Sequence, residues 1–187
     1  MRKSFGKNSW LFPLPVLLIG TYNEDGSADV MTAAWGGIYD TNQVFLCLSD
    51  DHKTTKNILR EKSFTVSFGD AAHVKEADYV GMVSGNQVKD KVKKSGLTPV
   101  QAEHVHAPYF KELPVCVECS LWKVNEDGMI IGNIVDVSAE EEVLTEGKID
   151  CDKFHPLAFD PSVNAYRTVG EKVGQAFGTG REIAREK

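Results

Sequence analysis

The fold of this chain is decided by residues 15–35, which read PVLLIGTYNEDGSADVMTAAW. Residues 15–22 form an apolar run, and residues 28–35 form a second run of mostly apolar and small side chains. Between the two runs, Asp25-Gly26 supplies the positive φ that a tight hairpin turn requires. The segment therefore predicts two antiparallel strands, and we expect Gly36-Gly37 to end the second one.

Further short elements follow this hairpin toward the C-terminus. Apolar periodicity and the turn residues between the runs set their limits. We expect, in chain order, a strand at 43–49, a helix at 53–62 introduced by Asp50 and Asp51, a strand at 63–68, a helix at 70–81, a polar excursion at 84–108 that is partly helical near 90–94, and a hairpin of strands at 115–125 and 129–138.

The connections between these strands favour antiparallel pairing, because parallel neighbours need long crossovers and few helices are available to make them. We therefore predict a mainly β fold, a closed or partly closed antiparallel barrel with a few short helices. The barrel core should occupy about residues 13–140, and residues from about 168 to 187 should form an irregular tail. No linker divides the 187 residues, so we interpret residues 1–187 as a single domain.

The composition excludes several classes of protein. Lys and Arg number 21 against 27 Asp and Glu, a formal net charge of −6, which argues against broad nucleic-acid binding. No apolar run reaches the ~20 residues that a membrane helix needs, and the first residues lack the apolar core of a signal peptide. We expect a protein of the cytoplasm that contacts neither nucleic acid nor membrane.

Cysteine and histidine pairs give weak signals for a metal or redox centre. Cys116 and Cys119 form a CxxC pair, but their surroundings are typical of a strand, on which such side chains point to opposite faces. We interpret them as packing residues, with a metal or redox pair as the alternative. His104 and His106 would share a strand face, yet a third ligand is not evident, so we predict no metal site. Carboxylate clusters lie in polar turns and are interpreted as solvated surface.

One region combines features that suit a flat anionic ligand. Residues 31–37 are mostly small, so a ring could approach their backbone. Residues 49–57 offer hydroxyls, the cations Lys53 and Lys56, and the N–H groups of a helix start, which together suit a phosphate. The alternative is that Ser49 or Asp50 caps the helix and the lysines are solvated. The nearby small-residue strand favours the anion site.

These segments, taken together, resemble the flavin reductase-like, FMN-binding split-barrel family, most closely its flavoredoxin-type members. The resemblance spans about residues 13–170 and rests on the order and spacing of several short motifs. It is carried by 15–21, Asp25-Gly26, 30–35, 44–49, His52-Lys53-Thr54, Asn57-Ile58, 64–67, Ser84-Gly85, Asp90-Lys91, Glu118-Cys119 and Pro156-Leu157 with Tyr166.

The resemblance implies a Greek-key split barrel that dimerises, with FMN at the subunit interface. Met31, Thr32, Ala33, Ala34 and Trp35 would line the isoalloxazine ring, largely through backbone groups. The residues implied to hold the ribityl phosphate are Ser49, His52, Lys53, Thr54 and Asn57, and those implied to approach the flavin from elsewhere are Ser84, Gly85 and Lys91. The family often has an arginine just before the phosphate-binding hydroxyl, where this chain has Asp50-Asp51.

Three hypotheses about function follow from this resemblance. The first is an FMN-dependent oxidoreductase, a flavin reductase or a flavoredoxin-like electron-transfer protein that uses NAD(P)H. The flavin would carry that chemistry, so no catalytic side chain is required. The second is a non-catalytic FMN-binding or electron-carrier module, and the third is a small-molecule or metal-binding barrel without flavin. The electron acceptor, a small molecule or a protein, stays open, as does the choice between NADH and NADPH.

Overall fold

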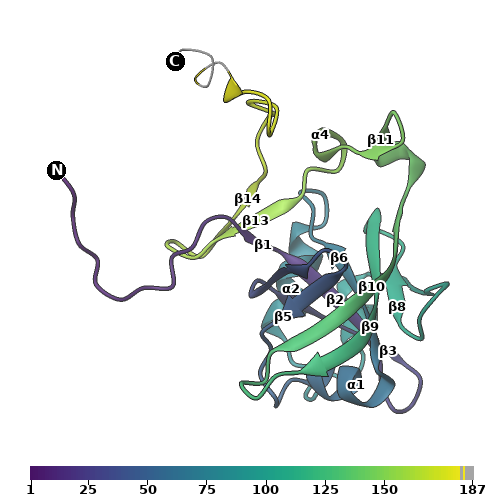
Figure 1. Cartoon of the computed structure of the whole chain (residues 1–187). Helices are drawn as coiled ribbons and strands as arrows, with labels where there is room; N and C mark the ends of the chain where they lie inside the picture. Colours follow the sequence, from purple (N-terminus) through teal and green to yellow (C-terminus); the bar gives the residue numbers. More distant parts are fainter. Residues whose placement is uncertain (182, 184–187) are drawn as a thin grey trace.

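A curled antiparallel sheet of seven strands dominates the computed structural model, which describes residues 1–181 and 183 (Figure 1). The strand order is β3-β2-β6-β9-β10-β5-β4. The strands are β2 (Leu17–Tyr22), β3 (Ala28–Ala33), β4 (Gly36–Asp40), β5 (Gln43–Leu46), β6 (Ser63–Phe68), β9 (Val115–Val124) and β10 (Ile130–Ala139). With the sheet curled on itself and few helices beside it, the mainly β split barrel predicted from the sequence is confirmed.

The barrel is split where the chain passes from β3 to β4, which are the two end strands of the sheet order although they follow each other in sequence. The prediction that Gly36-Gly37 ends a strand is wrong, because these glycines begin β4. A Cβ on Gly36 would lie 2.8 Å from Leu17 Cδ1, so glycine is needed here for close packing rather than for a turn. The bend falls instead at Ala34 and Trp35.

Two hairpins lie where the sequence predicted them. The β2–β3 pair turns at residues 23–26 and the β9–β10 pair at residues 125–128, and Gly26 and Gly128 adopt φ values of +79° and +84°. The strand expected at 43–49 is shorter, because the chain leaves the sheet after Leu46 and the Cys47 N–H donates to the Trp35 carbonyl at 2.8 Å.

Three helices occupy the expected region: α1 (Lys53–Glu61), α2 (Val74–Met82) and α3 (Lys91–Ser95). Helix α2 begins later than predicted, because the Asp70 carboxylate accepts the His73 N–H at 2.8 Å and holds residues 70–73 in a turn. The expectation that Asp50 and Asp51 introduce α1 is also wrong. The residue before the first turn of α1 is His52, and that turn contains no acidic residue.

The sequence analysis missed most of the smaller elements. Short strands escaped notice because two- to four-residue segments carry too little periodicity to be recognised. They are β1 (Leu14–Pro15), β7 (Pro99–Gln101), β8 (Pro108–Phe110), β11 (Leu144–Thr145), β12 (Lys148–Ile149), β13 (Leu157–Asp160) and β14 (Ala165–Thr168), with η1 (Glu141–Val143) and α4 (Cys151–Phe154). Strands β1, β13 and β14 form a separate sheet that packs beside the barrel, close to its split.

Strand β2 is buried on both faces, which explains its unbroken apolar run. Leu17 and Ile19 face the barrel interior, while Val16 and Leu18 on either side of them face α2 and the β13–β14 hairpin. The interior core consists of Leu17, Ile19, Ala33, Val44, Leu46, Ile58, Phe64, Val66, Val117, Cys119 and Ile130. The outer core consists of Val16, Leu18, Val30, Ala77, Val80, Val92, Leu97, Phe110, Leu113 and Leu157.

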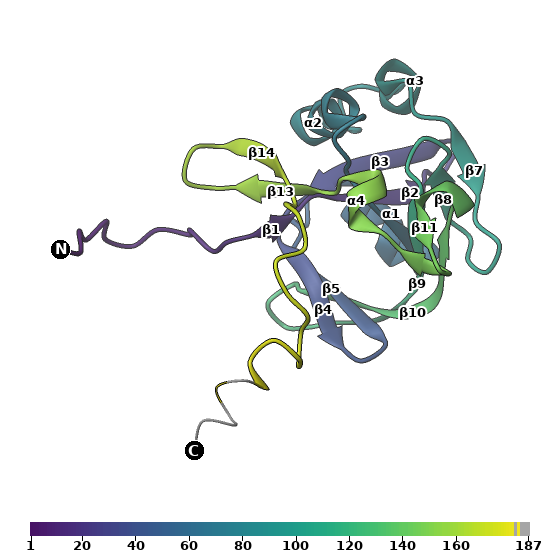
Figure 2. The ribbon, with the colours of Figure 1, turned by 90° about the horizontal axis from the view of Figure 1, so that it is seen from above.

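Both ends of the chain project from this body (Figures 1 and 2). Residues 1–13 are largely extended, residues 169–175 lack regular structure and residues 176–180 form turns. The predicted irregular tail also includes residues 182 and 184–187, which lie outside the described residues. In the part of the chain that the structure describes, no helix has the length and apolar character needed to cross a membrane.

Candidate functional site

A cleft of about 390 Å³ opens at the split of the barrel, where β3 ends. Its floor comes from the end of β3 and the bend after it, and its walls come from α2 and the β13–β14 hairpin. The lining residues are Val16, Met31, Thr32, Ala33, Ala34, Trp35, Cys47, Leu48, His52, Asp78, Gly81, Met82, Phe159 and Tyr166.

A smaller pocket of about 190 Å³ adjoins this cleft and shares Met31, His52, Gly81 and Met82 with it. We call the two together the long cleft, with a wide, mostly apolar end and a narrow end that carries the cations. The narrow end is also lined by Lys53, Thr54, Val80, Val83, Ser84, Gly85 and Lys91. An apolar space that leads into a basic one suits a ligand with a flat ring at one end and an anionic group at the other.

The long cleft brings together eleven of the thirteen residues predicted to bind the cofactor. Met31, Thr32, Ala33, Ala34 and Trp35 line its wide end, and His52 stands at the junction of the two ends. Lys53, Thr54, Ser84, Gly85 and Lys91 line the narrow end. Segments separated by up to sixty positions in the sequence therefore meet in one place.

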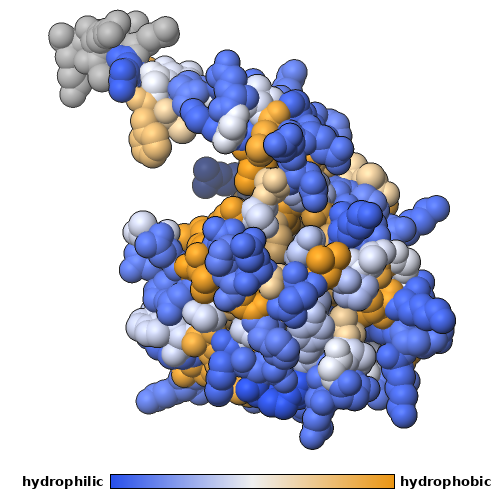
Figure 3. Space-filling view, turned by 90° about the vertical axis from the view of Figure 1, so that its right-hand side faces the viewer, coloured by the Kyte–Doolittle hydropathy of each residue, from blue (hydrophilic) through white to orange (hydrophobic). Residues whose placement is uncertain are grey.

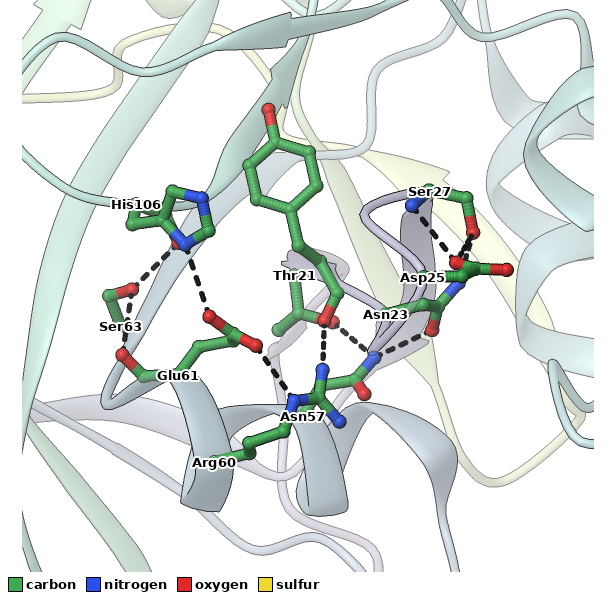
Figure 4. A network of polar contacts seen from close by, with 10 residues as sticks. Thr21, Asn23, Asp25, Ser27, Asn57, Arg60, Glu61, Ser63 and His106 are labelled. Atoms are coloured by element: carbon green, nitrogen blue, oxygen red, sulfur yellow. Dashed lines mark hydrogen bonds and ion pairs between the residues drawn. The ribbon is translucent and has the colours of Figure 1, made fainter.

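Asn57 lies outside the long cleft, although the resemblance implied that it holds phosphate. Its side chain is 2% exposed, and its amide nitrogen donates to Thr21 Oγ1 at 3.1 Å and to Asn23 Oδ1 at 2.9 Å. Figure 4 shows this amide between α1 and the turn of the β2–β3 hairpin. Asn57 thus fixes the helix against the sheet, an indirect contribution to the position of the residues before it.

Ser49 also lies outside the long cleft, on the exposed turn before α1. Its hydroxyl donates to the Asp51 carboxylate at 2.6 Å, which lowers the pKa of that carboxyl. Neither Ser49 nor Asp50 caps the helix, since α1 starts without a side-chain cap. Its hydrogen-bond ladder begins with the Lys56 N–H, so three earlier N–H groups are available to an anion. Asp50 and Asp51 are absent from the described lining of the long cleft.

The narrow end carries the ammonium groups of Lys53 and Lys91, close to the buried carboxylate of Asp29. Lys91 is 4% exposed and makes no hydrogen bond or ion pair among the described residues. Burial lowers its pKa, the Asp29 carboxylate opposes that shift, and Lys53 adds to it. Asp29 is itself occupied, because it accepts the Thr54 hydroxyl at 2.7 Å. The Lys53 ammonium donates to the carbonyl of Gly85 at 3.4 Å.

The loop at Gly85 has room for no side chain. A Cβ there would lie 2.5 Å from Asp29 Oδ1 and 3.1 Å from Lys53 Cδ. Glycine therefore lets the loop close over both groups at the narrow end. The Nδ1 atom of His52, at the junction, is buried and has no hydrogen-bond partner among the described residues. The unpartnered ring nitrogen indicates a polar ligand at this end, which the Lys91 side chain also lines.

Sequence reasoning missed one whole wall of the long cleft. The Tyr166 hydroxyl on β14 donates a hydrogen bond to the Asp78 carboxylate on α2 at 2.9 Å. Burial together with that carboxylate raises the pKa of Tyr166 to about 12. Phe159 on β13 lies beside Tyr166, with ring centroids 6.1 Å apart. The late Tyr166 contributed to the family resemblance, but only the β13–β14 sheet brings it to the site.

Comparison with known proteins identifies the family of the chain. Residues 9–168 match the family described as "Flavin reductase like domain". The chain belongs to the flavin reductase-like domain family. Flavoredoxin of Desulfovibrio vulgaris (Miyazaki F) is 38% identical, with a TM-score of 0.93 over 96% of this chain and 100% of that one. Flavoredoxin from Methanosarcina acetivorans is 30% identical, with a TM-score of 0.88 over 98% of this chain and 100% of that one.

A third structure shares the fold at lower identity. Nitrilotriacetate monooxygenase component B from Bacillus cereus is 19% identical, with a TM-score of 0.76 over 88% of this chain and 89% of that one. The flavin reductase-like family and the flavoredoxins together support a flavin-related oxidoreductase function for the chain.

In this flavin reductase-like barrel, the CxxC pair lies on strand β9 with both side chains buried. Cys119 joins the interior core, while Cys116 faces the other side of the sheet, as the alternation of a strand requires. Burial raises the pKa of both thiols, that of Cys116 to about 12. A thiol with so high a pKa is a poor nucleophile and metal ligand, which agrees with the interpretation of these cysteines as packing residues.

The prediction that His104 and His106 share one face of a strand is wrong. Both lie in the loop between β7 and β8, which is too irregular to keep a strand's alternation. His106 Nδ1 lies 3.1 Å from the Glu61 carboxylate (Figure 4), whereas His104 Nδ1 lies 3.6 Å from Glu118. The two imidazoles therefore serve different places in the flavin reductase-like fold.

Proposed function

We propose that the chain binds FMN in the long cleft and acts as an FMN-dependent oxidoreductase, a flavin reductase or flavoredoxin-like electron-transfer protein with NAD(P)H as electron donor. The observation that carries this proposal is the largely buried side chain of Lys91, whose ammonium has no hydrogen bond or ion pair among the described residues, at the narrow end of a wide apolar cleft. A largely buried charge is costly when its nearby carboxylate, Asp29, offsets only part of the burial cost, and a bound phosphate would supply a further counter-ion.

The narrow end would hold the phosphate. Lys53 and Lys91 would each offer an ammonium, and the first N–H groups of α1 would add donors at the positive end of the helix. Lysine presents a point charge without the paired donors of arginine, so the helix N–H groups would give the site its direction. The acidic residues just before α1 do not line this end, which supports phosphate binding in spite of them.

The wide end would hold the isoalloxazine ring. Residues 31–35 belong to an end strand of the sheet and to the bend after it, so their backbone groups can hydrogen-bond to the polar edge of a ring. The small side chains of Ala33 and Ala34 let the ring approach this backbone. When bound, FMN supplies the hydride and electron-transfer chemistry, and the protein supplies position and electrostatics.

Asp78 and Tyr166 would define the polarity of the opposite wall. Because its pKa is raised to about 12, the Tyr166 phenol keeps its proton at neutral pH and stays a hydrogen-bond donor to Asp78. This pair would hold the β13–β14 hairpin against α2 and so keep water from the wide end. The proposed chemistry needs no proton transfer by a side chain.

Titration with FMN tests the proposal directly. We expect quenching of flavin fluorescence to saturate at one FMN per chain, and a purified protein that retains FMN to be yellow. The FMN-loaded protein should then oxidise NADH or NADPH when an electron acceptor is present. Saturable FMN binding without oxidation of either nucleotide would indicate an electron carrier instead. Absence of FMN binding would refute both and leave a barrel for another ligand.

We also propose that the chain forms a homodimer with FMN at the interface. Several apolar side chains on β4, β9 and β10 are exposed, including Ile38 at 69%, Trp122 at 49% and Val137 at 49%. Trp35, on the rim of the wide end, is 52% exposed. Such an extent of exposed apolar side chains is typical of a surface that a partner covers.

The projecting ends of the chain support the same proposal. Trp10 and Phe12 on the N-terminal segment are 40% and 54% exposed, and the space-filling view shows apolar surface on the projecting C-terminal segment and on the body below it (Figure 3). A second copy, related by a two-fold axis, would cover these surfaces and enclose the ring. The excursion at 84–94 would lie near that interface.

Light scattering of the FMN-loaded protein tests the assembly. We expect twice the chain mass of 20.6 kDa. A mass of one chain at micromolar concentration would refute the dimer without affecting the FMN site. We propose a cytoplasmic location, which fractionation of the source cells would test.

A further inference from the structure

A second cleft, of about 300 Å³, lies against strands β9 and β10 and shares no lining residue with the long cleft. Three potential metal ligands converge at its edge: His104 from the β7–β8 loop, Glu118 from β9 and Asp136 from β10. One ligand atom from each lies within 4.8 Å of the other two. We propose that this His104–Glu118–Asp136 cluster binds a divalent transition-metal ion of the Zn²⁺ class.

The sheet itself creates the cluster. Glu118 and Asp136 are directly paired across β9 and β10, and the register shifts between Ile134 and Asp136. The bulge leaves Val135 without a partner and turns Asp136 toward the face that Glu118 occupies. Two carboxylates directly opposite on neighbouring strands repel each other, so this arrangement favours a cation between them.

Glu118 is held in place as a metal-binding carboxylate must be. It is 4% exposed, and the backbone N–H groups of Glu103 and His104 donate to its two oxygens at 3.3 and 2.7 Å. The more weakly bonded oxygen, Oε1, is the one that lies 3.6 Å from His104 Nδ1. Hydrogen bonds of this kind orient the carboxylate and leave lone pairs free for a metal.

The charge around the cluster is negative and uncompensated. Glu103 and Glu140 line the same cleft, and no lysine or arginine occurs among its lining residues in the described part of the chain. Within those described residues, His104 is also the only group that forms an ion pair with Glu118, and only when its imidazole is protonated.

The ligand set and spacing point to zinc rather than calcium or magnesium. A tetrahedral zinc site separates its nitrogen and oxygen ligands by about 3.4 Å, since each lies ~2.0–2.2 Å from the metal. Here His104 Nδ1 lies 3.6 Å from Glu118 and 3.9 Å from Asp136 Oδ2. The side chains of His104 and Asp136 are 45% and 42% exposed, so small movements would close the site and water would complete it.

Calorimetric titration of the untagged full-length chain with Zn²⁺ tests the proposal. The exposed thiols Cys47 and Cys151 should first be changed to serine, because free thiols bind zinc themselves. We expect one Zn²⁺ per chain. His104→Ala and Asp136→Asn should each weaken Zn²⁺ binding by at least ~10–100-fold. Loss of a residue that only hydrogen-bonds to a metal ligand already has an effect of that size, and these two residues would be ligands themselves.

His106→Ala is the matched control, because it removes an exposed imidazole from the same loop that contacts Glu61 instead. It should bind Zn²⁺ as the parent does. Zinc should also raise the thermal unfolding midpoint of the parent and of His106→Ala, but not that of Asp136→Asn. Absence of saturable binding, or equal affinity in His104→Ala and the parent, would overturn the proposal. FMN binding is measured independently, at the other cleft.

Discussion

Replacing Lys91 by methionine should affect ligand binding and protein stability in opposite directions. Methionine keeps most of the length and apolar character of the lysine side chain and removes only its charge. Lys91 is 4% exposed, and no hydrogen bond or ion pair of its ammonium occurs within the described residues. If that ammonium is a phosphate ligand, the variant loses a charge-assisted hydrogen bond to FMN.

The expected loss of affinity follows from the strength of such a bond. A hydrogen bond to a charged group contributes about 1.5–3 kcal/mol, and each 1.4 kcal/mol changes a dissociation constant tenfold, so the Kd for FMN should rise by about 10- to 100-fold. Lys53 and the first N–H groups of α1 remain in the variant, so binding should weaken but persist.

The FMN-free protein should become more stable. Burial lowers the pKa of Lys91, which means that the folded state holds its proton less tightly than the unfolded state does. At neutral pH the charged ammonium therefore opposes folding, and Asp29 offsets only part of that cost. In the parent, the free energy of unfolding should rise as pH increases from this lowered pKa toward 10.5, and the variant should lack that rise.

Fluorescence titration with FMN and urea unfolding without it measure the two effects. Lys93→Met is the matched control, since it removes the same charge from an exposed position on the same helix. It should leave both quantities near those of the parent. A Kd for FMN in Lys91→Met within twofold of the parent would refute the assignment of Lys91 to the phosphate, whatever the effect on stability.

Three further predictions use other parts of the molecule. Gly85→Ala should weaken FMN binding at least tenfold in fluorescence titration, because the new methyl group collides with the groups that form the narrow end, whereas Gly170→Ala, in open space, should not. Replacing Cys116 and Cys119 together by serine should lower the unfolding midpoint, because buried hydroxyls replace packed thiols. NAD(P)H-dependent flavin reduction should persist in the folded variant, and its complete loss would contradict the packing role of these cysteines. In the parent, the free energy of unfolding should fall as pH rises from about 10 to about 12, since the unfolded state ionises Tyr166 first, and Tyr166→Phe should lessen that fall in denaturant titrations across this range.

Local sequence determined the strands and turns that repeat a clear pattern. Strand β6 matches its predicted limits of 63–68, and the turns of both predicted hairpins fall where they were expected, because strand alternation and positive φ depend on neighbouring residues alone. The error at Gly36-Gly37 has a different origin. Gly36 is required by Leu17 and Leu46, which come from strands that lie elsewhere in the sequence.

In the candidate site, too, the sequence indicated some features correctly and packing decided others. The sequence alone, with the family motifs that it contains, pointed to β3 and the start of α1, and eleven of the thirteen residues it indicated line the long cleft. Asn57 lies in the same motif and yet turns inward, because a helix directs successive side chains around its axis and only packing decides which side faces the sheet.

Contacts between distant residues were decided by the tertiary structure. The wall formed by Asp78 and Tyr166 joins positions 88 residues apart, and the cluster of His104, Glu118 and Asp136 depends on a strand register and a bulge. The sequence determined which residues can form strands, turns and a helix start, because those preferences are local. Which chemical groups meet at a cleft depended on how the sheet curls and which strands pair, and that is fixed only when the whole core packs.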